Sequence, residues 1–133
     1  MTNCDCCDTP EMEFLYKKAY LKLYIAVLDN FPDYMTPTLV AHSMLSAHLL
    51  FEENTSYKAW LKDSFRKVVV RVSSAEFAKI AALEDVHIGS ENNTLGGQAA
   101  CIVVCPREDN PNVLKYAKLW APKKVAEGVN EEI

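Results

Sequence analysis

Three cysteines and two aspartates lie close together near the start of the chain, in the stretch CDCCD. The cysteines are Cys4, Cys6 and Cys7. Thiolates and carboxylates can hold zinc or a softer metal. However, the C-x-C-C spacing is not that of a zinc finger, and the second pair of ligands that a finger uses is absent. We therefore expect residues 1–10 to form a flexible, oxidation-prone tail, and we predict no metal and no cofactor.

Histidines and two further cysteines are the other candidates for catalysis or ligand binding. His42 and His48 are expected on one helix, but at this spacing they point in different directions and cannot share a ligand. His42 either packs beside the apolar stripe of that helix or lines a cleft at the edge of the sheet. His87 directly precedes a predicted loop and is the better site candidate. Cys101 and Cys105 are expected to be buried structural residues of a strand, and no Ser-His-Asp or Cys-His spacing is present.

The composition is typical of one globular domain. The chain has 133 residues, of which half are apolar, and a formal net charge of -4. Nucleic-acid-binding domains are usually clearly basic. No run reaches the ~18 apolar residues of a membrane span, and the polar, acidic start is not a secretory signal. We expect a cytoplasmic protein with reduced cysteines and no membrane contact. One dense basic run is expected to be a solvated face: Lys58, Lys62, Arg66, Lys67 and Arg71.

The stretch KVVVRVSSAEF, residues 67–77, gives the clearest structural signal. Its closely spaced valines are typical of a buried strand. Ser73 and Glu76 then have the spacing of a capping box, which opens a helix. The other expected elements are a helix over 11–20, a strand over 23–28, a helix of about four turns from 37, a short helix within 53–65, strands over 86–88 and 98–106, and a helix from 110 to about 118.

This order of elements predicts the α/β class. Apolar strands separated by helices imply a sheet that is covered on both faces. We therefore expect a three-layer sandwich with a mixed sheet of about four strands. Residues 11–121 should form this single domain, and residues 122–133 should form a polar C-terminal tail.

Five segments carry a resemblance to a known family: KLYIAVLD, LVAHSMLSA, WLKDSFRKVVVRVSSAEFAKI, GGQAACIVVCP and NVLKYAKLW. In this order, the chain from about residue 22 to residue 120 resembles the archaeal and eukaryotic type of peptidyl-tRNA hydrolase, the Pth2 family. The resemblance implies a Pth2-like fold, in which the segments supply successive strands and helices.

The catalytic motifs of that family do not carry over. The family has a lysine- and glycine-containing stretch before its first helix, where this chain has PDYM. The family's D-x-G-x-T loop should lie within VHIGSENNTLGG, where Gly97 fits but the aspartate and threonines do not. An acidic loop with Asp29 and Asp33 also repels a phosphate backbone. We therefore expect the fold without the hydrolase activity, whereas a lysine that reached an ionised acid in this groove from elsewhere would contradict this expectation.

The Pth2-like layout would bring the start of the first long helix and the loop after residue 87 to one side of the sheet. Thr36 resembles an N-cap followed by Pro37 at the first helical position. The unpaired N–H groups and positive dipole end of such a helix can hold a small anion. A tight loop that only leads into the last strand is the alternative. The candidate ligand-binding residues are Tyr34, Thr36, His42, Asn92, Asn93, Gly96 and Gly97.

Our first interpretation of function is a non-catalytic binding or accessory protein on a hydrolase-like scaffold. Its partner would be a host protein, the tRNA machinery or a small nucleotide-like anion. The stretch LKLYIAVLDNFPDYMTPTLVAHSM has a fainter resemblance to small accessory proteins of T4-like bacteriophages, a group that includes a modifier of host valyl-tRNA synthetase. The alternative is an active peptidyl-tRNA or aminoacyl-ester hydrolase with His87 as base and Asn92 as oxyanion donor. A homo-oligomer formed at an open sheet edge is the third interpretation.

Overall fold

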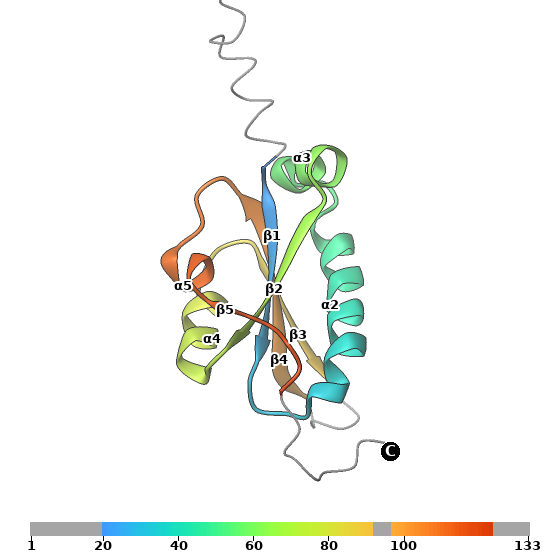
Figure 1. Ribbon diagram of the computed structural model, residues 1–133. Coiled ribbons are helices and arrows are strands. Elements are labelled where there is room, and N and C mark those ends of the chain that lie inside the picture. Colours follow the sequence, from blue (N-terminus) through green and yellow to red (C-terminus); the bar gives the residue numbers. More distant parts are fainter. Residues whose placement is uncertain (1–19, 92–96, 124–133) are drawn as a thin grey trace, which may run out of the picture.

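The computed structural model describes residues 20–91 and 97–123, which form a five-stranded mixed sheet with helices (Figure 1). The strands are β1 (Lys22–Leu28), β2 (Arg66–Val72), β3 (Val86–Glu91), β4 (Gln98–Arg107) and β5 (Lys118–Leu119). The helices are the 3-10 turn η2 (Asp33–Met35), α2 (Thr36–Phe51), α3 (Thr55–Asp63), α4 (Ser74–Ala81) and α5 (Asn112–Lys115). The α/β class is as predicted, but the sheet has five strands where four were expected.

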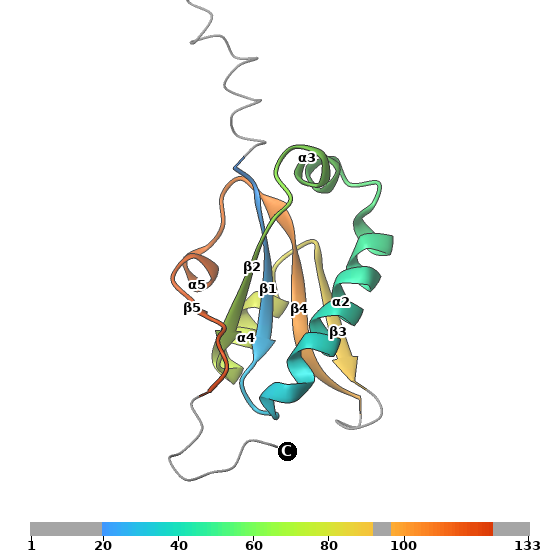
Figure 2. The same ribbon diagram turned by 45° about the vertical axis from the view of Figure 1, so that its right-hand side comes forward.

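The strand order is β3-β4-β1-β2-β5. β1 and β2 run parallel, and the other neighbouring strands are antiparallel. Figures 1 and 2 show α2 on one side of the sheet, with α4 and α5 together on the other side. Every side chain of β1 from Leu23 to Leu28 is buried, because this central strand is covered on both faces.

Helix α2 contains no Asp, Glu, Lys or Arg between Thr36 and Phe51. It lies very close to β3, since a Cβ atom added to Gly89 would be 2.3 Å from Ser43 Oγ. The glycine therefore lets the helix approach the strand at this point. The buried residues of α2 recur every three or four positions and are Thr36, Leu39, Ser43, Ala47 and Phe51.

Three boundaries differ from the prediction. Thr36 is not the N-cap, because α2 begins at Thr36 and the preceding Met35 makes no side-chain capping bond. Helix α5 covers only four residues, since the chain turns after it and pairs with β2 as β5. The strand expected over 86–88 continues to Glu91 along β4.

Some sequence predictions fall outside the described ranges. These are the cysteine-containing segment 1–10, the helix expected over 11–20 apart from Tyr20, and most of the expected C-terminal tail. Among the helices within 20–91 and 97–123, none is both long enough and apolar enough to span a membrane.

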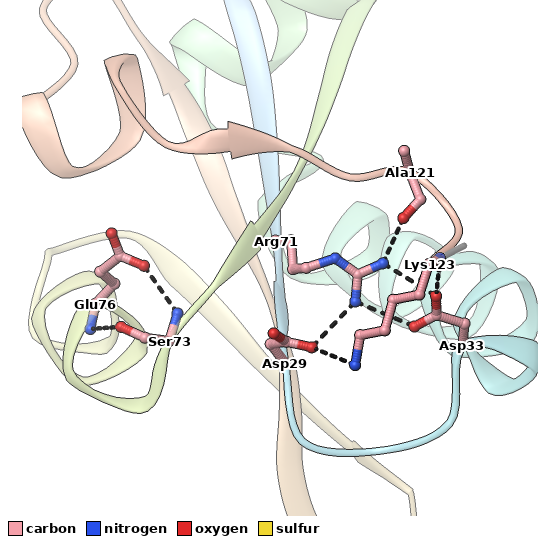
Figure 3. Close-up of polar contacts among 7 residues, drawn as sticks. All are labelled: Asp29, Asp33, Arg71, Ser73, Glu76, Ala121 and Lys123. Atoms are coloured by element: carbon pink, nitrogen blue, oxygen red, sulfur yellow. Dashed lines mark hydrogen bonds and ion pairs between the residues drawn. The ribbon is translucent and has the colours of Figure 1, made fainter. Parts of the chain in front are cut away.

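The connection from β2 to α4 is formed as predicted. Ser73 Oγ accepts a hydrogen bond from the backbone N–H of Glu76 at 3.2 Å, and Glu76 Oε1 accepts one from the N–H of Ser73 at 2.8 Å. This reciprocal capping box satisfies two backbone donors at the start of the helix. It therefore fixes the point at which the chain leaves β2 (Figure 3).

We expect Ser73→Ala to lower the free energy of unfolding by about 1 kcal/mol, because the Ala side chain cannot accept the capping bond. Urea unfolding monitored by circular dichroism measures this change. Ser74→Ala is the matched control, since Ser74 is exposed at the first helical position. Equal effects of the two substitutions would contradict the role of the capping box.

Candidate functional site

The carboxyl ends of β1 and β2 form the natural place for a site in this topology. The two strands are adjacent and parallel. The chain leaves β1 toward α2 on one face of the sheet and leaves β2 toward α4 on the opposite face (Figures 1 and 2). In open α/β sheets, ligands bind in the crevice that such a reversal of direction creates.

An ion-pair network occupies this position (Figure 3). Arg71 of β2 donates from Nη1 to Asp29 Oδ1 and to Asp33 Oδ1, and from Nη2 to Asp33 Oδ2, at 3.1 Å in each case. Lys123 Nζ lies 2.9 Å from Asp29 Oδ1, and the backbone N–H of Lys123 donates to Asp33 Oδ2 at 2.8 Å. Arg71 also donates to the carbonyl oxygen of Ala121. The end of β2, the loop after β1 and the C-terminal segment are thus joined; we call these four charged residues the Arg71 network.

Electrostatics favour the charged forms of Asp29, Asp33 and Arg71 in this network. The hydrogen bond from Arg71 is the main cause that lowers the pKa of Asp33, and the hydrogen bond from Lys123 is the main cause for Asp29. Burial opposes both shifts. The pKa of Arg71 is raised, chiefly by its bond to Asp33. Because both carboxyls are held in their ionised, ion-paired form, each is a weak proton acceptor at neutral pH.

A lysine that reaches an ionised acid in this groove from elsewhere in the chain was expected to contradict a loss of catalysis, and Lys123 is such a lysine. It comes from far along the chain and sits beside the ionised Asp29. In the described residues, however, both of its carboxylate partners are shared with Arg71, whose side chain is only 9% exposed. The Lys123–Asp29 contact therefore belongs to a network in which the charges balance. The hydrolase alternative remains to be tested.

The prediction that Arg71 belongs to a solvated basic face is wrong, because its side chain is only 9% exposed.

The structure separates the other residues predicted to form a cleft. Tyr34 is 78% exposed on η2, whereas Thr36 is buried with no hydrogen-bond partner for Oγ1 among the described residues. His42 is exposed on α2, and His87 is half-buried on β3. Gly97 precedes β4 with a φ of 84°, which suits glycine. The remaining candidates lie outside the described ranges: Asn92, Asn93, Gly96, Cys4, Cys6 and Cys7.

Among the described residues, His87 has no carboxylate bonded to it that could orient it as a catalytic base. Burial lowers its pKa, and the charge of the nearby His42 lowers it further. The interacting group is thus a second base, not a carboxylate that could orient the imidazole. Burial also raises the pKa of the Cys101 and Cys105 thiols to about 11. Both cysteines are therefore protonated and poorly nucleophilic at neutral pH.

An exposed apolar surface covers the outer side of α2 and α3. We call it the α2–α3 face, and its exposed members are Leu45 (67%), Leu49 (66%), Leu61 (41%) and Phe65 (56%). A hollow of about 340 Å³ within it is lined mainly by apolar side chains, including the buried Tyr57 and Trp60. Of the apolar stripe that we expected on α2, Leu39, Ala47 and Phe51 are buried, whereas Leu50 is exposed. The α2–α3 face was not predicted. The available signal was the absence of charged residues from the whole helix.

Phe65 has an unusual backbone at the edge of this face. Its φ is 65°, in the left-handed region, where a bulky side chain is disfavoured and glycine is common after a helix. The strained backbone places the Phe65 ring over Trp60, with ring centroids 5.4 Å apart, while more than half of the residue stays in solvent. Strain at an exposed aromatic residue supports a functional contact.

Lys67 lies on the same face, and its ammonium group packs against two aromatic rings. Its Nζ is 3.2 Å from the Phe65 ring centroid and 5.3 Å from the Trp60 ring centroid. Burial lowers its pKa. Nζ donates to the carbonyl oxygen of Phe65 at 2.8 Å, and no carboxylate in the part of the chain that the structure describes pairs with it. The face therefore combines apolar contact with one cation that lacks an anion.

We expect Arg71→Gln to lower the free energy of unfolding at pH 7 by about 1–2 kcal/mol, since hydrogen bonds to charged groups contribute roughly 1.5–3 kcal/mol and Asp29 is partly exposed. Because the pKa of Asp33 is lowered by folding, this stabilisation is present above its ordinary pKa of about 4 and is lost as the pH falls through the folded value. Urea unfolding at pH 7 and pH 3 should show a wild-type advantage that shrinks at pH 3.

Lys79→Gln is the control for this prediction, because Lys79 is an exposed lysine of α4 away from the network. Its effect should be small at both pH values. An Arg71→Gln effect that is no larger than the control, or that does not change with pH, would show that the ion pairs contribute little.

The observed order of elements is the order that the sequence pattern predicted, with strand β5 added after α5. A scan against known protein families finds no match for this chain, and a search among curated proteins finds no similar sequence. The resemblance to the Pth2 family therefore rests on the five sequence segments alone.

Proposed function

We propose that the protein is a non-catalytic binding or accessory protein on a Pth2-like scaffold, and that it binds a partner protein through the α2–α3 face. The observation that carries this proposal is the exposed apolar surface formed by Leu45, Leu49, Leu61 and Phe65. Single exposed apolar residues are common on proteins, but contiguous apolar patches mark interaction sites.

The shape and charge of this face indicate the kind of partner. A shallow apolar hollow beside a helix accepts the apolar side of an amphipathic helix. The ammonium of Lys67 forms no ion pair with a described carboxylate, and a carboxylate next to the apolar anchors of that helix would neutralise it. The partner is therefore a protein segment with apolar residues at helical spacing and an adjacent Asp or Glu. If the chain is phage-encoded, as its fainter resemblance implies, this partner is a host protein, and a component of the tRNA machinery fits the scaffold.

Active hydrolysis of peptidyl-tRNA is the second candidate, and the Lys123–Asp29 contact is the observation that favours it. We expect the purified full chain to release no more free peptide from a peptidyl-tRNA than buffer does, because Lys123 and Asp29 are already paired with each other. Turnover that Lys123→Ala abolishes would replace the first candidate with the second.

A photo-crosslinking amino acid at Leu49 tests the binding proposal in a lysate of the cells that naturally produce the protein. The control carries the same amino acid at Tyr116, which is 79% exposed next to α5. We expect a specific adduct from position 49 that Leu45→Lys removes. Adducts of equal yield from both positions would contradict the proposal. An adduct between two copies of the chain would identify the face as a homodimer interface instead.

Phe65 allows binding and stability to be separated. We expect Phe65→Gly to lose the adduct while the free energy of unfolding changes by less than about 1 kcal/mol, because glycine suits the left-handed backbone. Phe65→Ala should also lose the adduct and should be about 1 kcal/mol less stable than the glycine variant. Urea unfolding of the two variants measures this difference. A full adduct yield from Phe65→Gly would rule out a role of the ring in binding.

A further inference from the structure

The end of the sheet opposite the Arg71 network carries a row of three cations. Lys22 at the start of β1 is paired in register with Arg66 of β2 on one side and with Arg107 of β4 on the other side. Like charges at directly opposed positions of neighbouring strands destabilise a sheet. Three cations side by side are therefore an unfavourable arrangement for the protein alone, and a bound anion would relieve it.

The three cations line one hollow together with a fourth. Its volume is about 600 Å³, within the usual range for small-molecule sites. Lys115 of α5 supplies the fourth cation. In the described ranges, neither Lys22 nor Lys115 forms an ion pair with an acid. The hollow thus concentrates positive charge in a chain whose net charge is -4.

Several donors in the hollow remain able to bind a ligand. Arg66 lies over the Tyr20 ring with its guanidinium carbon 4.8 Å from the ring centroid, and its side chain donates no hydrogen bond to the described residues. Arg107 uses Nη2 to donate to the carbonyl oxygen of Glu84, and an arginine has five N–H donors in all. The Oδ1 atom of Asn110, which lines the same hollow, is buried and accepts no hydrogen bond from the described residues.

Two carboxylates determine what size of anion fits. Glu108 and Asp109 also line the hollow, and both are exposed. They oppose a long polyanion that runs across the surface, but a compact phosphate group can still reach the row of cations. The chemistry therefore favours a small phosphorylated molecule over nucleic acid.

We propose that this hollow binds a small molecule with two or more linked phosphates, such as a nucleoside triphosphate. The row of Arg66, Lys22 and Arg107 holds the phosphates, and Lys115 closes over them from α5. The Oδ1 atom of Asn110 accepts a hydrogen bond from a hydroxyl or amino group of the same ligand. This site is distinct from the α2–α3 face, because no residue lines both hollows.

Titration of the full chain with ATP, pyrophosphate and adenosine, at low salt and monitored by backbone amide NMR, tests the proposal. We expect saturable shifts at Lys22, Arg66 and Lys115 with ATP and pyrophosphate and none with adenosine. Arg66→Gln and Lys115→Gln should each weaken ATP binding about tenfold, the factor that corresponds to loss of one charged hydrogen bond. Lys118→Gln, a change at an exposed lysine of β5, should bind ATP like the wild type.

Lys22→Gln adds a readout that a purely structural role would not give. Without ligand it should raise the melting temperature by a few degrees, because it removes the repulsion between opposed cations. It should also lose the increase in melting temperature that ATP gives to the wild type. The proposal is overturned if neither ATP nor pyrophosphate binds, if adenosine binds equally well, or if only tRNA binds. Loss of the Leu49 adduct in Leu45→Lys with unchanged ATP binding would show that the two sites are separate.

Discussion

The parallel pairing of β1 and β2 at the centre of the sheet is the constraint on which the rest of the structure depends. Because β1 is buried on both faces, the chain has to leave these strands toward opposite layers. The Arg71 side chain lies near the carboxyl end of β2 and is only 9% exposed. A cation that is buried to this extent needs a paired anion. Asp29, Asp33 and the segment ending at Lys123 provide the pairing and are held together by it.

This pairing also decides where function can reside. α/β proteins usually bind ligands in the crevice at this end of the sheet. Here the side chains of Asp29, Asp33, Arg71 and Lys123 occupy that position and neutralise one another. Two other surfaces keep unbalanced features. The α2–α3 face exposes apolar area and a strained Phe65. The opposite end of the sheet holds a row of cations at Lys22 that form no ion pair with an acid among the described residues. Each of these features would be relieved by the molecule that we propose binds there.

Local signals made most of the fold predictable from the sequence. The valines of β2 and the Ser73 capping box are encoded by neighbouring residues, and both are found where they were expected. Strand β5 was missed because two residues have no periodic pattern and become a strand only by pairing with β2. The partners of Arg71 were missed for a similar reason, since Asp29 and Asp33 lie 42 and 38 residues away. The exposed apolar face of α2 was missed because an apolar sequence pattern does not indicate which side of a helix remains in contact with solvent.

The carboxyl groups of Asp29 and Asp33 test the central claim most directly. Their titration can be followed by carbon-detected NMR on the labelled full chain between pH 2 and pH 7. The ion pairs with Lys123 and Arg71 predict that both carboxyls titrate below their ordinary pKa of about 4. A midpoint at or above that value for either carboxyl would contradict the account, because the crevice would then contain an acid free to take part in proton transfer.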